Sequence, residues 1–332
     1  MNSNIDFVVT WVDPSDPKWQ SERHKYYPES LYMQDTSAKR YRDWGIFPYW
    51  FRAVERYAPW VDKIHLVTFG HIPHWLNIDH PKVRIVRHAD FMPTQYLPVF
   101  SSHPLELNLH RIPDLADQFV YFNDDVLLNK PAKPQDFFDH GLPCDFFTFG
   151  VLSGSMDYTF AHIYINNNYI INRNFNINNI NKRCLFNLKC SLASNLRNLI
   201  LSQRNSISPL RNKHMSISFL KSSFIRVWEK EYAVLDATCH HRFRDIRDVS
   251  PYLIREWQLL ENRFVPCSDK DFGLYCYAGI ENAKIKNNLG KYYRMICIND
   301  TEIPEINFES YKLELSDLLQ QQFPHKSEFE LG

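Results

Sequence analysis

The sequence has no excess of either charge and no long apolar run. Lys and Arg together number 38, and so do Asp and Glu. This balance argues against a dedicated nucleic-acid binder, which normally carries a strongly basic surface. A helix that crosses a bilayer needs about 20 apolar residues, and no stretch approaches that length. The first residues also lack the basic and apolar segments of a signal peptide. We therefore expect a cytoplasmic protein, and peripheral association with the inner face of the cell membrane stays open.

Disulfide bonds and a zinc site are not indicated either. The seven cysteines are an odd number and include no C-x-x-C pair, so we expect reduced thiols. Cys239 and the two histidines after it resemble part of a zinc site, but no second ligand pair follows at zinc spacing. What the chain does have is 44% hydrophobic and 15% aromatic residues over 332 positions. That composition is sufficient for a packed core in one large or two smaller domains.

The first half of the chain alternates strand-like and helix-like segments. Runs of β-branched and aromatic residues predict strands at 5–12, 63–68, 83–86 and 119–122, and helical spacing predicts helices at 44–57 and 105–112. This alternation predicts the α/β class, with a Rossmann-like, mostly parallel sheet, flanking helices and an additional helical insertion. Ligands of such sheets bind beyond the carboxyl ends of the strands, where Asp13, Asp124 and Asp125 stand.

The second half begins with two segments of unusual composition. Residues 165–181 are rich in Asn, and residues 182–205 have leucines at helical spacing among Lys and Arg, which predicts a basic amphipathic helix. Its apolar face either packs on the domain or contacts a membrane surface or an acidic polymer. We interpret 165–205 as an insertion. Beyond it, the patterns predict helices at 219–232 and 250–260, the second capped by Ser250, then a strand at 292–298 and a short terminal helix.

The clearest candidate for chemistry is the run Asn123-Asp124-Asp125 at the end of a predicted strand. Adjacent carboxylates repel each other, and their burial is costly unless a cation compensates. Mg²⁺ and Mn²⁺ prefer carboxylate oxygen and commonly bridge to phosphates, so the run suits a metal that holds a diphosphate. The alternative is an Asx turn that caps the next element. Asn299-Asp300 repeats the arrangement at a second strand end.

Basic residues form a second group of candidates. His214 precedes the helix at 219–232, and Arg244 and Asp248 lie in a charged run after it. An arginine suits phosphate oxygens, and a histidine can accept a proton from an attacking hydroxyl. The alternatives are a self-paired, solvated charge run and a surface histidine. Arg40 and Asp43, before the first long helix, could bind phosphate at its N-terminus or pair within their own segment.

Taken together, these motifs resemble the Stealth family of sugar-phosphate transferases. The family includes bacterial capsular polysaccharide phosphotransferases and the catalytic subunit of the animal lysosomal-enzyme GlcNAc-1-phosphotransferase. Its four conserved regions resemble residues 5–19, residues 40–77 with 97–128, residues 213–224 with 243–253, and residues 295–300. Three residues depart from the family pattern: Pro14 stands in place of a common glycine, and Ile46 and Pro48 in place of Glu and Arg.

The resemblance implies transfer of a hexose 1-phosphate or N-acetylhexosamine 1-phosphate from a UDP-sugar to a carbohydrate hydroxyl, with release of UMP. It implies a divalent metal, Mg²⁺ or Mn²⁺, a nucleotide-sugar donor, a glycan acceptor, and a place in capsule or exopolysaccharide synthesis beside the membrane-associated assembly machinery. By position, it assigns catalysis to His214, Arg244, Asp248 and Asp125, metal binding to Asp124, Asp125 and Asp300, and donor binding to Asp13, Arg40, Asp43, Asn123 and Asn299.

The expected organisation has three parts. Residues 1–150 form the nucleotide-sugar-binding α/β part, residues 151–212 an Asn-rich insertion with the basic amphipathic helix, and residues 213–332 a second catalytic part. Two other functions stay open. A metal-dependent glycosyltransferase would use the same donor but release UDP, and a non-catalytic glycan-binding protein would use the aromatic residues as sugar platforms.

Overall fold

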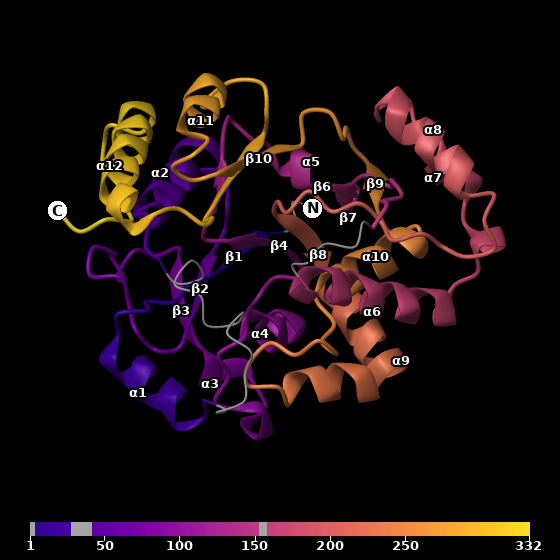
Figure 1. Ribbon diagram of the computed structural model, residues 1–332, viewed down its shortest axis with the longest axis horizontal. Helices are drawn as coiled ribbons and strands as arrows, with labels where there is room; N and C mark the ends of the chain where they lie inside the picture. Colours follow the sequence, from indigo (N-terminus) through magenta and orange to yellow (C-terminus); the bar gives the residue numbers. More distant parts are fainter. Residues whose placement is uncertain (1–3, 28–41, 153–157) are drawn as a thin grey trace.

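A five-stranded sheet forms the centre of the protein (Figure 1). The computed structural model describes residues 4–27, 42–152 and 158–332, and the strands of this sheet follow the order β3–β2–β1–β4–β8. They are β1 (Ile5–Thr10), β2 (Ile64–Thr68), β3 (Val83–Arg87), β4 (Gln118–Asn123) and β8 (Ile217–Leu220). The first four run parallel, and β8 runs antiparallel to β4. The predicted α/β class with a mostly parallel sheet is confirmed.

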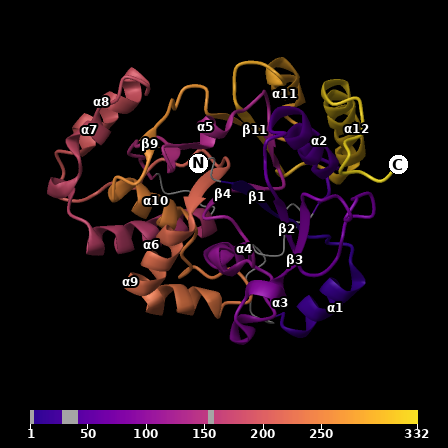
Figure 2. The ribbon, with the colours of Figure 1, turned by 180° about the vertical axis from the view of Figure 1, so that it is seen from behind.

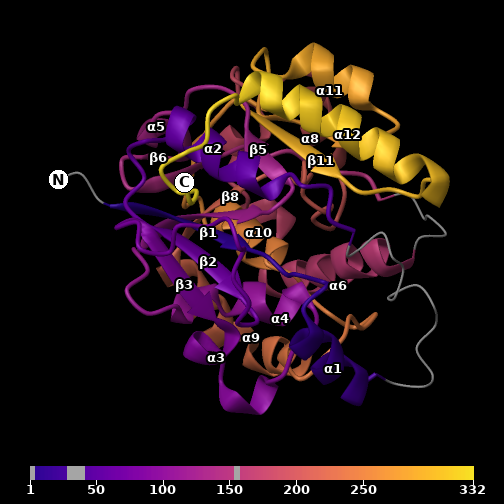
Figure 3. The same ribbon diagram turned by 90° about the vertical axis from the view of Figure 1, so that its left-hand side faces the viewer.

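Both faces of the central sheet are buried. In β1, Phe7 and Val9 join one hydrophobic core and Val8 joins the other, because successive side chains of a strand point to opposite faces. Figure 3 shows α2 and α12 on one side of the sheet and α4 and α9 on the other. The helices that close the two cores are α2 (Phe47–Tyr57), α12 (Glu305–Gln322), α4 (Ser102–Leu107), α9 (Lys221–Cys239) and α10 (Tyr252–Leu260).

Two three-stranded sheets adjoin the central one. The first consists of β10 (Gly273–Tyr277), β11 (Met295–Asn299) and β5 (Val126–Leu128), and the second of β6 (Phe138–Asp139), β7 (Leu142–Asp145) and β9 (Val265–Pro266). Only Asp124 and Asp125 separate β4 from β5, so these two residues join the central sheet to the first of these sheets. The other helices of the described residues are α1 (Pro17–Lys25), α3 (His88–Phe91), α5 (Pro134–Phe137), α6 (Tyr158–Asn174), α7 (Lys182–Leu185), α8 (Leu192–Leu201) and α11 (Asn282–Asn288).

The elements of the second half differ from the predicted ones in three places. Strand β8 was not predicted; its four residues are all buried, and a short apolar run does not distinguish a buried strand from a helix. The cap of α10 is Pro251 and not Ser250, since the helix begins at Tyr252. The terminal helix is also not short, because α12 has 18 residues.

The basic segment 182–205 does not form one helix that packs through its apolar face. It contains α7 and α8, which lie at the outer edge of the molecule in both Figure 1 and Figure 2. The buried side chains of α8 are those of Ser194, Asn195 and Asn198, so its polar face packs on the protein. The first alternative for this segment, packing of its apolar face on the domain, is therefore wrong. The division of the chain at 150 and 212 stays a prediction.

All seven cysteines are buried and free, as the absence of a C-x-x-C pair indicated. Burial raises the pKa of the Cys144, Cys190 and Cys276 thiols to about 11, so these thiols stay protonated at neutral pH. Within the described ranges, no helix combines the length and the apolar character that a membrane span requires.

Helix α10 carries two adjacent buried charges with different surroundings. Arg255 donates two hydrogen bonds of 2.7 Å to the carboxylate of Asp145 in β7. Its neighbour Glu256 is 2% exposed. Burial raises the pKa of the Glu256 carboxyl to about 8, although the charge of Arg255 acts in the opposite direction. Since Arg255 is already paired with Asp145, Glu256 is largely protonated in the folded protein at neutral pH.

We expect Glu256→Gln to stabilise the protein, and to do so more strongly as the pH rises. An unfolded chain releases the Glu256 proton near pH 4.5, whereas the folded protein retains it up to about pH 8. The free energy of unfolding of the wild type therefore falls, relative to the variant, by up to about 1.4 kcal/mol per pH unit between these values. Urea unfolding of both proteins across this range measures the difference. A difference that does not change with pH would contradict the protonated state of Glu256.

Candidate active site

Three distant parts of the chain meet beside the turn formed by Asp124 and Asp125. Strand β4 ends at Asn123, directly before the turn. Strand β8 runs antiparallel to β4, so the segment before β8, which contains His214, lies at the same end of the sheet. Strand β11 runs antiparallel to β5, so its last residue, Asn299, lies beside the turn as well. The topology thus brings an imidazole and two amides to a pair of carboxylates.

Asp125 lies at the centre of these contacts. Its backbone carbonyl accepts a hydrogen bond of 2.9 Å from the N–H of Ile298. Its Oδ2 accepts bonds from the Asn299 amide at 2.9 Å and from the Cys297 thiol at 3.4 Å. Its Oδ1 is buried and has no hydrogen-bond partner within the described residues. One side-chain atom each of Asp125, His214 and Cys297 lie within 4.8 Å of one another.

The pKa of the Asp124 carboxyl is raised in the folded protein. Burial, and next the charge of Asp125, raises the pKa of the Asp124 carboxyl to about 7. The charge of Asp43 acts in the same direction, which places Asp43, from the segment before α2, near the turn. Asp43 itself accepts a hydrogen bond of 2.8 Å from the N–H of Gly45. A cation between these acids would relieve their repulsion.

His214 is oriented through both of its ring nitrogens. Nδ1 lies 3.0 Å from the hydroxyl of Tyr252, and Nε2 lies 3.4 Å from the amide nitrogen of Asn123. Because an amide nitrogen donates, Nε2 accepts, and Nδ1 then carries the proton that the Tyr252 hydroxyl accepts. The backbone of His214 has a left-handed φ of 54°, and its N–H donates a bond of 2.7 Å to Asn212 Oδ1. A strained conformation of this kind is common where a side chain has a functional orientation.

A buried polar chain fixes Asn123 from inside the protein. The Tyr121 hydroxyl lies 2.8 Å from Asn123 Oδ1, 2.9 Å from Glu106 Oε1 and 3.0 Å from Thr10 Oγ1. Burial raises the pKa of this hydroxyl well above its ordinary value, so Tyr121 is a neutral hydrogen-bonding group. The single proton of this hydroxyl goes to Glu106 or to Asn123, and the Asn123 side chain lies between Tyr121 and His214.

The residues at the turn fit a divalent cation. The partnerless, buried Oδ1 of Asp125 is costly for a protein unless another group binds it. A ring nitrogen of His214 lies close by, and Asp124 is near enough for the charge of Asp125 to raise its pKa. Burial raises the pKa of Cys297 well above its usual range, so the thiol stays protonated and serves as a donor to Asp125. The carboxylate oxygens that remain suit Mg²⁺ or Mn²⁺, and the imidazole of His214 lies beside them.

Asp13 lies three residues beyond the end of β1, because the strand ends at Thr10 and not at residue 12. Its Oδ1 accepts hydrogen bonds from the N–H and the hydroxyl of Ser15 at 2.8 and 2.6 Å, which closes an Asx turn. Its N–H donates a bond of 2.8 Å to His71 Nε2, and burial lowers the pKa of His71. No direct contact joins Asp13 to the Asp124-Asp125 turn in the described part of the chain, so its role in donor binding stays a prediction.

Asp300 forms an ion pair with Arg42, which was not predicted as a site residue from the sequence. Arg42 donates hydrogen bonds of 3.0 and 2.9 Å to the two carboxylate oxygens of Asp300 and a third to the carbonyl of Thr301. Both side chains are 12% exposed. The assignment of Asp300 as a metal ligand stays a prediction, and it requires Arg42 to release an oxygen. Arg40 lies outside the described residues.

Arg244 and Asp248 belong to the segment between α9 and α10. The buried carboxylate of Asp248 accepts hydrogen bonds from His103 Nδ1 at 3.1 Å and from His241 Nδ1 at 2.7 Å. Burial alone would raise the pKa of Asp248, but these bonds outweigh it and hold the pKa below its usual value. Asp248 thereby fixes this segment to α4. Arg244 is partly exposed, and no direct contact joins it to the Asp124-Asp125 turn within the described residues.

Three residues beside the site were not predicted from the sequence, and only one of them had a signal in the sequence. Cys297 lies two positions before Asn299 in β11, so strand periodicity places both side chains on one face, and that signal was available. Arg42 lies in the same short run as Arg40 and Asp43, but nothing in the run indicates which residue reaches Asp300. Tyr252 begins α10, and only tertiary packing brings it to His214.

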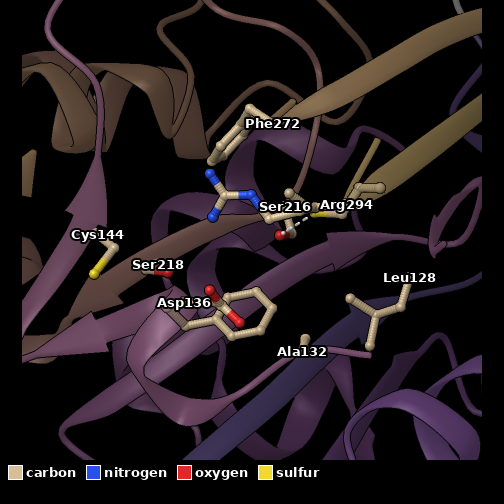
Figure 4. Close-up of a pocket in the computed structure, with 10 residues that line it drawn as sticks. Leu128, Ala132, Asp136, Cys144, Ser216, Ser218, Phe272 and Arg294 are labelled. Carbon is tan, nitrogen blue, oxygen red and sulfur yellow. Dashed lines mark hydrogen bonds between the residues drawn. The ribbon is translucent and has the colours of Figure 1, made fainter. Parts of the chain in front are cut away.

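A separate recess lies outside this site (Figure 4). Arg294, Asp136, Ser216 and Cys144 are among the residues that line it, and the Arg294 guanidinium lies 5.5 Å from the ring centroid of Phe272. None of the residues that the sequence assigned to catalysis, metal or donor binding lines this recess.

Comparison with known proteins matches the chain to one family over most of its length. Models of two conserved regions of Stealth proteins match it, region 1 over residues 3–30 and region 2 over residues 40–144. The capsular polysaccharide phosphotransferase WcwK of Streptococcus pneumoniae is 39% identical over 331 residues, which are 98% of each chain. The exopolysaccharide phosphotransferase cps2G of Lactiplantibacillus plantarum is 40% identical over 98% of this chain and 96% of that protein.

Similarity to solved structures is much weaker. The galactosyltransferase LgtC, solved in complex with donor and acceptor sugar analogues, is 11% identical over 97% of this chain and 98% of its own, with a TM-score of 0.39. A likeness of this size supports no conclusion about function. In contrast, the two polysaccharide phosphotransferases match 98% of this chain with sequence identities of 39% and 40%. On that basis the chain belongs to the Stealth family, together with the bacterial polysaccharide phosphotransferases that it matches.

Proposed function

We propose that this protein is an enzyme that transfers a hexose 1-phosphate or N-acetylhexosamine 1-phosphate from a UDP-sugar to a carbohydrate hydroxyl, with release of UMP. The product would belong to a capsular or other surface polysaccharide. Relatives that match nearly the full chain are named phosphotransferases of such polysaccharides. The structural observation that carries the proposal is the buried, partnerless oxygen of Asp125 beside His214.

Asp124 and Asp125 would hold Mg²⁺ or Mn²⁺, with Asp300 as a further ligand if Arg42 releases one of its oxygens. When bound, the cation supplies positive charge against the oxygens of the donor diphosphate. Asn123 and Asn299 present amide groups beside the same turn, and we assign them to the donor phosphates or sugar hydroxyls. Asp13, Asp43 and Arg40 complete the proposed donor site.

His214 is the proposed general base. With the amide nitrogen of Asn123 opposite it, Nε2 is the nitrogen that lacks a proton, so it can take the proton of the acceptor hydroxyl. The hydroxyl oxygen forms a bond to the β-phosphorus of the donor, while the bond from that phosphorus to the bridging oxygen breaks. UMP leaves with the bridging oxygen. Tyr252 acts as a positioning residue; burial raises the pKa of its hydroxyl well above the ordinary value, so it stays protonated.

Arg244 is the proposed cation for the transferring phosphoryl group. Its partly exposed guanidinium can donate to phosphate oxygens in a planar fork. Asp248 supports it indirectly, because it fixes the segment 241–248 through His103 and His241. Loss of that carboxylate would release the segment that carries Arg244.

The leaving nucleotide distinguishes this reaction from its alternatives. Incubation of the chain with Mn²⁺, a UDP-sugar from a panel and a glycan acceptor is expected to release UMP, because attack at the β-phosphorus leaves the α-phosphate on uridine. Chromatography identifies the nucleotide. Asp125→Asn should lower the rate on the order of 100-fold or more. Asp79→Asn, which alters an exposed acid between β2 and β3, should leave the rate unchanged.

Release of UDP would instead show a glycosyltransferase, which breaks the bond between the anomeric carbon and the phosphate. Tight glycan binding without nucleotide release from any donor would favour a non-catalytic binding protein. Either outcome contradicts the proposal.

Substitution of His214 is expected to lower kcat more than it changes KM. His214→Gln should reduce kcat by about 100-fold or more, since general-base catalysis contributes at least that factor. Tyr252→Phe should reduce kcat by about ten-fold, because the imidazole loses the partner of Nδ1 but keeps its basic nitrogen. His74→Gln, at an exposed histidine, serves as the control. Steady-state kinetics of the three variants test the assignment, and a His214→Gln enzyme with wild-type kcat would refute it.

A further inference from the structure

Helix α8 exposes its apolar side chains and buries its polar ones. Ser194, Asn195 and Asn198 are between 1% and 3% exposed. Asn198 donates a hydrogen bond of 3.0 Å to the carbonyl of Phe147 and accepts one of 2.8 Å from the N–H of Phe149. Polar contacts therefore hold α8 on the protein. A surface helix normally packs through its apolar face and exposes its polar one, so this orientation is the reverse of the usual arrangement.

The outward face of α8 and the segment before it form a continuous apolar surface, which we call the α8 stripe. Its members are exposed by 85%, 83%, 59%, 44% and 60%, and they are Leu188, Leu192, Leu196, Leu199 and Ile200. Residues 192, 196, 199 and 200 lie on one face of a helix, because their spacings are those of neighbouring turns. An exposed apolar patch of this kind marks an interaction surface.

The segment of the chain that carries the α8 stripe is basic. No Asp or Glu occurs from residue 158 to residue 228, while ten Lys and Arg do. Lys182, Arg183 and Lys189 precede α8 and Arg204 follows it, and all four are exposed. The segment that carries the stripe therefore has basic charge at both of its ends and no acidic residue of its own to neutralise it.

An apolar stripe with basic residues at both ends fits the surface of an anionic lipid bilayer. Leucines of such a helix enter the boundary between headgroups and acyl chains, while Lys and Arg contact the lipid phosphates. A second copy of this chain fits less well. A two-fold contact through the stripe would place the same basic residues against one another, and the segment contains no acid to pair with them.

We propose that α7 and α8 dock this protein on an anionic membrane surface, with the α8 stripe inserted at the lipid interface. The position of both helices at the outer edge of the molecule (Figure 1 and Figure 2) leaves this face accessible. The proposal concerns where the protein binds and does not depend on the reaction assigned to the candidate active site.

Co-sedimentation of the full chain with lipid vesicles tests this proposal. We expect binding to vesicles of phosphatidylcholine mixed with phosphatidylglycerol, and binding weaker by about ten-fold or more to phosphatidylcholine alone. Replacement of Leu192, Leu196 and Ile200 together by Gln should lower binding to the mixed vesicles by about ten-fold or more. The melting temperature should not fall, because these side chains are exposed.

The matched control lies on α12. Ile306 and Leu313 are 89% and 65% exposed but lie among Glu305, Glu309 and Glu314. Ile306→Gln with Leu313→Gln should leave vesicle binding unchanged. Lys182→Gln with Arg183→Gln should weaken binding several-fold at low salt, and the loss should shrink as salt rises, since salt screens the attraction.

Failure of the wild-type chain to sediment with the mixed vesicles overturns the proposal, and so does an equal loss in the α12 control. A dimer in solution that the triple Gln substitution converts to a monomer, without vesicle binding, would instead assign the α8 stripe to contact between copies. That result would also show the lipid proposal to be wrong.

Discussion

The site depends on two neighbouring carboxylates that the fold holds together at the junction of two sheets. Because only Asp124 and Asp125 separate β4 from β5, the two strands fix the backbone positions of both acids. Burial and mutual repulsion make ionisation of both acids costly, as the raised pKa of Asp124 shows. Asn299 and Cys297 donate to one oxygen of Asp125, and the other has no partner among the described residues. This uncompensated negative charge is the physical reason to expect a metal ion at the turn.

Several other buried acids of the described residues are paired within the protein. Asp145 is paired with Arg255, Asp300 with Arg42, and Asp248 with two histidines. Those contacts tie distant segments together: β7 to α10, and the end of β11 to the segment before α2. Clusters of acids whose pKa is perturbed and whose charge is uncompensated are typical of functional sites. The compensated acids build the frame, and the uncompensated pair lies where a charged substrate and its metal would bind.

The sequence predicted the part of this arrangement that follows from local patterns. The first four strands and the acids after β1 and β4 could be placed because buried strands have a simple composition and ligands bind beyond their carboxyl ends. Strand β8 was missed because its four residues, three of them apolar, are too few before a helix to show a period of their own. The pairing of Arg42 with Asp300, and of Tyr252 with His214, could not be predicted because each joins residues far apart in the chain. The orientation of α8 could not be predicted either, since side-chain amides of Asn195 and Asn198, and not leucines, determine which face packs.

We propose that Asp124 and Asp125 form a metal site that is ready for a nucleoside diphosphate. Titration of the protein with Mn²⁺, followed by the electron paramagnetic resonance signal of the free ion, tests it without reference to turnover. We expect a stoichiometric Mn²⁺ site that binds more tightly in the presence of UDP, is lost in Asp125→Asn, and is retained in Asp79→Asn. Equal Mn²⁺ binding by the wild type and Asp125→Asn would contradict it.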